Sequence, residues 1–143
     1  MPSILLIEDD DSIRSMYGFA LKREGYDVVQ VADVTQAMDQ VQERHFDVIL
    51  LDMLLGEGMS GLDFLRNYNV QVESPQTKVV GLSNIDSEAV IEKARGLGVE
   101  NYLNKANTEP AQVVTFLQQL LGGPVTSTDG VPVSTTDATP PAN

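Results

Sequence analysis

The stretch that decides the fold is residues 4–10, Ile4-Leu5-Leu6-Ile7-Glu8-Asp9-Asp10, in which four apolar residues are followed by three acids. A continuous apolar run of this length predicts a strand buried on both faces, as in a parallel sheet. Three further apolar runs end on a polar residue in the same way: 48–51 on Asp52, 79–82 on Ser83 and 102–104 on Lys105. Ligands of parallel sheets bind outside the carboxyl ends of the strands. We therefore expect these polar side chains to share one edge of a sheet.

Helical patterns alternate with these runs. The first predicted helix begins at Asp10 or Asp11 as its cap and ends at Gly25, and further strands are expected at 27–31 and 99–103. Later helices are expected to begin at Asp33, after the glycine-rich loop 56–61, at Asp86 and at Thr108, the last with Pro110 in its first turn. The pattern amounts to five βα units, which predicts an α/β fold with a doubly wound parallel sheet between helices. The apolar positions expected to face the core in the first and fourth helices are Ile13, Met16, Tyr17, Ala20, Leu21, Ala89, Val90, Ala94 and Leu97.

The domain organisation follows from a change in composition. Residues 1–121 are long enough for one domain with a proper core. From residue 122 onward the chain turns to Gly, Pro, Ser, Thr and Asp, and such a segment buries too little apolar surface to offset its ordering entropy. We predict a single domain over 1–121 and a disordered tail over 122–143.

Charge and cysteine content exclude several classes of function. The formal net charge of -12 repels nucleic acid and anionic lipid, so we expect no nucleic-acid or membrane partner. The same charge favours Mg²⁺ and basic patches on partner proteins. The absence of cysteine excludes disulfides and thiolate metal sites. The first residues lack the pattern of a signal peptide and no apolar stretch is long enough to span a bilayer, so we expect a cytoplasmic protein.

The polar strand ends predict a site for phosphoryl chemistry. Asp52 directly follows a buried strand, and Glu8 and Asp9 end a strand expected beside it. Carboxylates packed this closely repel one another and raise a pKa unless a cation lies among them, and oxygen ligands in this number suit Mg²⁺. A carboxylate beside Mg²⁺ can attack phosphorus. Lys105 can then neutralise phosphoryl oxygens and Ser83 can donate a hydrogen bond to one of them.

This constellation resembles the receiver domain of two-component response regulators, over roughly residues 3–121. The resemblance implies a flavodoxin-like (βα)5 three-layer sandwich with parallel strand order 2-1-3-4-5. By the same resemblance Asp52 is the phosphoacceptor. Asp9, Glu8, Asp52 and the backbone carbonyl of Leu54 are the ligands of Mg²⁺ or Mn²⁺.

The resemblance also implies the remaining roles and the partners. Ser83 and Lys105 assist catalysis on the phosphoryl group, and Ser83 and Tyr102 form the switch, with Tyr102 as the family's rotating aromatic. A histidine kinase or histidine phosphotransfer protein would supply the phosphoryl group. A downstream protein target would read the face formed by the fourth helix, the fifth strand and the fifth helix. The expected product is a stand-alone response regulator, not an enzyme beyond its own phosphorylation and dephosphorylation.

Three features depart from the family pattern. The segment 53–61 is one residue longer than usual between the acceptor and its glycine. Ala106 stands where the family has a proline after the lysine in a cis bond, so we expect either a trans bond with a shifted loop or a strained cis bond. Leu54 and Ile85 are apolar where the family flanks the hydrolytic water, with Asn84 beside them. We hypothesise that this slows loss of the phosphoryl group.

Other interpretations remain open at this stage. A strand-end aspartate such as Asp52 is often only a helix cap, and Tyr102 can be plain core. Asp10 and Asp11 are better explained as caps or solvated charges, and His45 as solvent-facing. Among whole functions, a degenerate receiver that only binds proteins is the main alternative. An aspartate-nucleophile phosphohydrolase is disfavoured by Leu54, and a flavodoxin-type nucleotide binder by the acids after the first strand.

Overall fold

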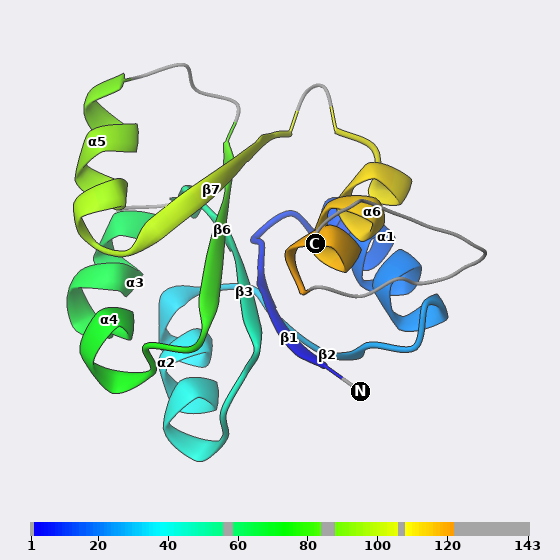
Figure 1. Ribbon diagram of the computed structural model, residues 1–143, viewed down its shortest axis with the longest axis horizontal. Helices are drawn as coiled ribbons and strands as arrows, with labels where there is room; N and C mark the ends of the chain where they lie inside the picture. Colours follow the sequence, from blue (N-terminus) through cyan, green and yellow to red (C-terminus); the bar gives the residue numbers. More distant parts are fainter. Residues whose placement is uncertain (1, 56–58, 84–87, 106–107, 122–143) are drawn as a thin grey trace, which may run out of the picture. The chain divides into compact units, whose positions relative to one another are not determined.

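The computed structural model describes residues 2–55, 59–83, 88–105 and 108–121. The chain divides into two compact units, Met1–Pro110 and Ala111–Asn143. The first unit contains the whole sheet and all the predicted site residues (Figure 1). The described part of the second unit is the remainder of helix α6 (Pro110–Leu120) and Leu121, and the helix side chains Val113, Val114 and Leu117 are buried. The predicted boundary after residue 121 stays a prediction.

The first unit is built on a five-stranded sheet in which every neighbouring pair is parallel, in the order β2-β1-β3-β6-β7. Numbered along the chain among themselves, these strands have the order 2-1-3-4-5, so the predicted fold class is confirmed. The bounds of the strands are β1 Ser3–Ile7, β2 Asp27–Val31, β3 Val48–Asp52, β6 Lys78–Ser83 and β7 Val99–Asn104.

Two short strands that the sequence did not predict follow β3. Strand β4 (Leu54–Leu55) pairs antiparallel with β5 (Met59–Ser60). They lie in the segment that carries the extra residue. The parallel register of β3 and β6 is unbroken.

Helices cover both faces of the sheet in the first unit. Figure 1 shows α1 on one side and α2, α3 and α5 on the other. Their caps follow the sequence: the Asp10 carboxylate accepts from Ile13 N at the start of α1, and Asp33 from Gln36 N at the start of α2. Helix α3 begins with a capping box of Ser60 and Asp63. The bounds are α1 Asp11–Arg23, α2 Val34–Glu43, α3 Gly61–Asn67, α4 Val70–Glu73 and α5 Glu88–Gly96.

The side chains of the central strands are buried on both faces of the sheet. Leu5, Ile7, Ile49 and Leu51 belong to the cluster shared with α2, α3 and α5, while the intervening strand residues are equally buried. Two of the predicted core positions are wrong. Met16 is 47% exposed and Ala89 is also exposed, because the buried face of each helix is narrower than the apolar stripe in its sequence.

Hydrogen bonds between side chains and backbone join the amino ends of three strands. Ser3 N donates to Asp47 Oδ2 over 2.8 Å, which ties β1 to the start of β3. Thr77 Oγ1 donates to the Phe46 carbonyl over 2.6 Å, and Ser74 Oγ lies 2.5 Å from Thr77 Oγ1 and 3.3 Å from His45 Nδ1. We call Ser3, His45, Asp47, Ser74 and Thr77 the amino-end network. His45 itself is about half exposed, at 54%, as expected.

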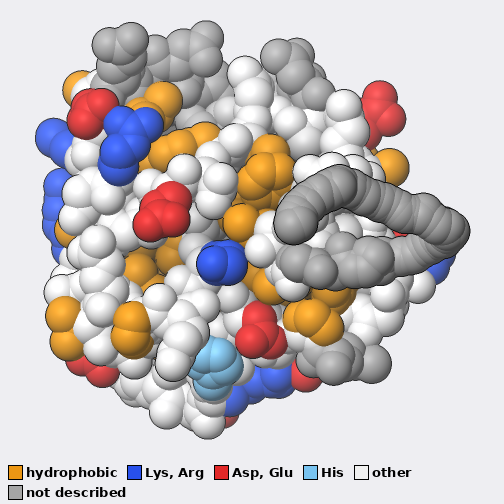
Figure 2. Space-filling view, in the orientation of Figure 1, with side chains coloured by type: hydrophobic (Ala, Val, Ile, Leu, Met, Phe, Trp, Pro, Cys, Tyr) orange, Lys and Arg blue, Asp and Glu red, His pale blue; other side chains and the backbone are white. Residues whose placement is uncertain are grey.

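The charges on the surface are mixed. On the face drawn in Figure 2, acidic and basic side chains are interspersed and the basic ones form no continuous patch among the described residues. No helix within the described ranges is long and apolar enough to cross a membrane.

Candidate phosphoryl and metal site

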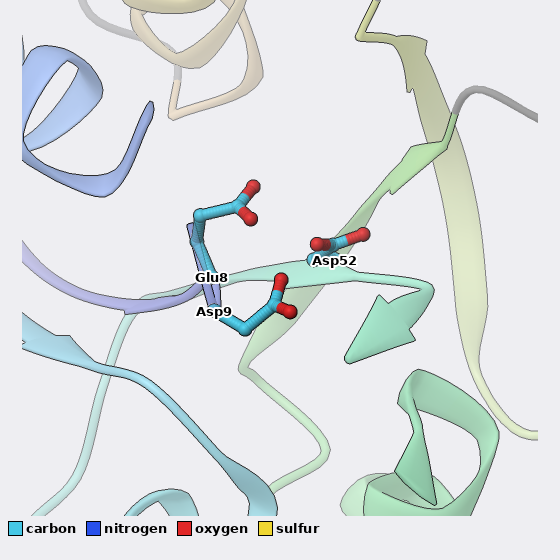
Figure 3. Close-up of side chains that lie close together, drawn as sticks. All are labelled: Glu8, Asp9 and Asp52. Carbon is cyan, nitrogen blue, oxygen red and sulfur yellow. The ribbon is translucent and has the colours of Figure 1, made fainter. Parts of the chain in front are cut away.

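The register of the sheet places the predicted acids side by side. Ile7 of β1 pairs with Leu51 of β3, so Glu8 and Asp52 follow neighbouring positions on adjacent strands. Figure 3 shows the side chains of Glu8, Asp9 and Asp52 converging at this edge, with Asp9 and Asp52 directed toward one another. The clustering that strand ends predicted is therefore present.

The ammonium of Lys105 lies between two of these carboxylates. Lys105 Nζ is 2.8 Å from Glu8 Oε1 and 3.1 Å from Asp52 Oδ2. The three side chains are only 11%, 0% and 2% exposed, respectively. Lys105 is held there by its backbone, because its N–H donates to the Ser83 carbonyl over 3.1 Å at the ends of β7 and β6. One cation thus lies between two buried carboxylates.

Burial and this crowding shift the protonation of Glu8. Loss of solvent raises the pKa of Glu8 to about 7, with Lys105 opposing the shift and Asp52 adding to it. Burial alone would lower the pKa of Lys105, but its hydrogen bond with Glu8 and the charge of Asp52 outweigh that and raise it. The ammonium is therefore retained, and Glu8 is the group whose charge responds near neutral pH.

The donor set fits a hard divalent cation. Glu8, Asp9 and Asp52 each offer an oxygen, and these oxygens lie within 4.8 Å of one another. Among the described residues, the buried Glu8 Oε1 has the Lys105 ammonium, 2.8 Å away, as its partner. Oxygen ligands of this kind suit Mg²⁺ or Mn²⁺. Asp9, which is exposed, leaves one side of the cluster open to solvent.

The other predicted site residues take different places. Ser83 ends β6 and is half-buried, next to the strand end that carries Lys105. Tyr102 lies on β7, half-buried, and its hydroxyl donates to the Ile91 carbonyl of α5 over 3.3 Å. Burial raises the pKa of Tyr102. The backbone of Leu54 belongs to strand β4, in the hairpin that follows Asp52.

Some predictions lie outside the described residues. These are Asn84, Ile85, the cap at Asp86 and the Lys105–Ala106 bond. The roles proposed for Leu54 and Ile85 in phosphoryl loss stay hypotheses.

Two contacts that support Glu8 were not predicted from the sequence. Arg14 Nη1 donates to the Glu8 carbonyl over 2.8 Å, and Asp10 N donates to Glu8 Oε2 over 3.1 Å. Both fix the turn from β1 into α1. The spacing of Arg14, four residues after the Asp10 cap, was the available signal. Residues four apart lie on the same face of a helix, so Arg14 lies on the face that carries the cap. Asp10 itself acts as a cap, as expected.

Comparison with known proteins agrees with this geometry. The sequence profile of the response regulator receiver domain matches residues 4–117. The sensory transduction protein RegX3 of Mycolicibacterium smegmatis is 33% identical over 107 residues, which cover 73% of this chain and 44% of RegX3. RegX3 of Mycobacterium tuberculosis H37Rv matches to the same extent. This chain therefore spans about half the length of these curated relatives.

Solved structures show the same fold. Chemotaxis protein CheY4 of Vibrio cholerae superposes with a TM-score of 0.75 and 28% identity, over 83% of this chain and 98% of that one. A CheY-like receiver domain of Methanospirillum hungatei gives a TM-score of 0.77 at 21% identity, over 85% of this chain and 94% of the other.

The fold and the family match define a signalling module of two-component systems rather than a classical enzyme. The chain belongs to the response regulator receiver domain family.

Proposed function

We propose that this receiver accepts a phosphoryl group on Asp52 from a histidine kinase or a histidine phosphotransfer protein. The observation that carries the proposal is the Lys105 ammonium held between Asp52 and Glu8, at 3.1 and 2.8 Å. A buried cation already aimed at the acceptor carboxylate is the arrangement that stabilises charge developing on a transferring phosphoryl group. A plain helix cap needs neither the burial nor the lysine.

The transfer proceeds by in-line displacement. An oxygen of Asp52 forms the new bond to phosphorus while the bond from phosphorus to the donor imidazole nitrogen breaks, and the leaving imidazole takes a proton from solvent. Lys105 balances the negative charge that gathers on the phosphoryl oxygens. Glu8, Asp9 and Asp52 would hold Mg²⁺, with the Leu54 carbonyl as a further candidate, and the ion would neutralise phosphoryl oxygens when bound.

The output is proposed to be a protein contact that depends on phosphorylation. Ser83 ends β6, the strand beside the one that carries Asp52, and its carbonyl accepts from Lys105 N. Tyr102 connects β7 to α5 through its hydroxyl. A phosphoryl group on Asp52 adds oxygens that can pull the Ser83 hydroxyl inward, and this is the kind of local charge change that biases a surface with two arrangements.

The kind of output depends on the length of the protein. The chain matches nearly the whole of CheY4 but less than half of RegX3, so receivers of both lengths are among its relatives. We propose that the output of this receiver is read by a basic protein surface, because the net charge of -12 disfavours nucleic acid. The mass of the native protein and the partners it retains in a pull-down test this part separately.

The acceptor function is tested by beryllofluoride, a mimic of the bound phosphoryl group. With Mg²⁺ present, the purified protein is expected to bind it, with chemical shift changes at Ser83 and Tyr102. Asp52→Asn is expected to abolish binding, and Asp39→Asn, a matched change at an exposed acid on α2, is expected to leave it intact. Absence of binding to the unaltered protein would favour the alternative, a degenerate receiver that only interacts with proteins.

A further inference from the structure

The ring of Tyr102 lies in a space that exists only because residue 81 is glycine. Gly81 pairs with Tyr102 across β6 and β7 and with Leu51 across β6 and β3. A Cβ atom on Gly81 would lie 2.7 Å from Cε1 and 2.8 Å from Cδ1 of Tyr102. Glycine within a buried strand is unfavourable by itself and commonly marks a close approach of another group. Here the approaching group is an aromatic side chain.

The same space is bounded by the residue that follows the acceptor. Met53 is buried, and its Sδ would lie 3.5 Å from a Cβ on Gly81 and 3.0 Å from a Cβ on Gly61. The Met53 thioether therefore lies close to both Gly61 and Gly81. The Tyr102 ring lies close to Gly81 as well. Met53 and Tyr102 also share one apolar cluster. Thioether sulfur packs favourably against aromatic rings.

Two backbone hydrogen bonds hold Met53 in place, one to β6 and one to the start of α3. Its N–H donates to the Leu82 carbonyl over 2.9 Å, and its carbonyl accepts from Gly61 N over 3.2 Å. The side chain that borders the Tyr102 ring is thus attached to the peptide immediately after Asp52. Met53 therefore joins this apolar cluster directly to the segment that carries Asp52.

We infer that Gly81 and Met53 are positioning residues that seat the Tyr102 ring and couple its position to the segment carrying Asp52. The coupling runs through direct packing, in addition to any contribution from Ser83. The inference rests on the proposed function in one respect: the coupling serves signalling only if Asp52 is phosphorylated. The Tyr102 ring would then relay the change to α5, because its hydroxyl donates to the Ile91 carbonyl. The seat itself is a property of the packing and can be tested without phosphorylation.

Alanine at position 81 removes the seat while leaving the acids, Lys105 and Ser83 unchanged. The ring is half-buried, so it can turn outward to escape the added methyl group. Fluorotyrosine incorporated into the full chain reports the change by ¹⁹F NMR, with Tyr102→Phe identifying the Tyr102 signal. In Gly81→Ala we expect that signal to move toward the position of an exposed tyrosine. We expect it to lose its response to beryllofluoride while beryllofluoride still binds.

A double-mutant cycle separates the seat from a general loss of stability. Gly81→Ala is expected to lower the urea midpoint in the native background. In a Tyr102→Ala background the same change is expected to leave the midpoint unchanged or raise it, because no ring remains to be displaced. Gly96→Ala is the matched control: a Cβ there meets nothing within 4 Å, so the midpoint should not fall and the Tyr102 signal should not move appreciably.

The outcomes are distinguishable. An unchanged Tyr102 signal in Gly81→Ala, or an equal drop in midpoint in both backgrounds, overturns the inference. If the native protein fails to bind beryllofluoride, the proposed function fails, while a displaced ring and a non-additive cycle still establish the seat.

Discussion

The polar side chains at the two ends of the parallel sheet make different kinds of interaction: ion pairs at the carboxyl ends and hydrogen bonds at the amino ends. At the carboxyl ends, Glu8, Asp52 and Lys105 bring three ionisable groups into nearly complete burial around a single cation. At the amino ends, the amino-end network exchanges hydrogen bonds between hydroxyls, backbone groups and the Asp47 carboxylate. Buried ion pairs are weak sources of stability, whereas satisfied hydrogen bonds contribute steadily. The comparison teaches that one end buries two carboxylates around one ammonium, while hydrogen bonds at the other end hold the strands together.

The largest effect is expected from removing the shared cation. Lys105→Ala leaves Glu8 and Asp52 buried without a counter-charge, and loss of one partner of a buried pair typically costs about 3–5 kcal/mol. Urea denaturation at pH 8 without divalent cations measures it. Lys78→Ala, at an exposed position on β6, is the control and should change stability by no more than about 0.5 kcal/mol. Equal stability of the two variants would contradict the contrast between the sheet's ends.

The pH dependence of stability gives the next largest effect. The pKa of Glu8 is raised from 4.5 to about 7 in the folded protein, mainly by burial. The folded state therefore binds this proton more tightly than the unfolded state. The resulting stabilisation is fully present below pH 4.5 and is lost as pH rises through about 7. The total is on the order of 3 kcal/mol at most.

Glu8→Gln isolates this contribution. The difference in stability between the native protein and Glu8→Gln, measured without divalent cations, should change across this pH range and level off above it. The native protein should lose stability relative to the variant as pH rises. A relative gain with rising pH would show that Glu8 is stabilised as a carboxylate.

Part of this contrast could be predicted from the sequence. Glu8, Asp52 and Lys105 each follow a strand-like apolar run, and the parallel topology brings such ends together, so their proximity was predictable. The complete burial of Glu8 beside an exposed Asp9 was not, because the two are adjacent in sequence and only the turn into α1 assigns their directions.

Other features needed the three-dimensional packing. The four-residue helix α4 is too short to leave a helical period, and the β4–β5 hairpin forms in a segment that reads only as a glycine-rich loop. Met16 was assigned to the core because its helix has a wide apolar stripe, yet the sheet covers only part of it. The amino-end network joins residues distant in sequence, such as Ser3 and Asp47, and no local pattern announces it.

A smaller effect tests the opposite end of the sheet. Thr77→Val keeps the side chain's shape but removes the hydroxyl that donates to the Phe46 carbonyl and lies beside Ser74. Leaving these buried groups unsatisfied should cost about 1–3 kcal/mol in urea denaturation. Beryllofluoride affinity should be retained, since the change is at the far end of the strands. A large loss of affinity with unchanged stability would reverse the roles assigned to the two ends.

The smallest effect is expected from removing the Asp10 cap, which distinguishes this acid from Glu8, Asp9 and Asp52. Asp10→Ala removes the carboxylate that accepts from Ile13 N, and such a loss typically costs about 1 kcal/mol. Its backbone N–H, which donates to Glu8 Oε2, is retained. Thermal or urea denaturation should therefore report a modest loss, and titration with beryllofluoride and Mg²⁺ should be nearly unchanged. Loss of binding as severe as in Asp52→Asn would place Asp10 within the site.

The central claim is that Asp52 accepts a phosphoryl group, and intact mass after incubation with a small phosphodonor and Mg²⁺ tests it most directly. We predict that the native protein gains the mass of one phosphoryl group and that peptide mapping places it on Asp52. We predict no gain for Asp52→Asn and strongly reduced gain for Lys105→Ala. No gain by the native protein, or an equal gain by Asp52→Asn, would contradict the account.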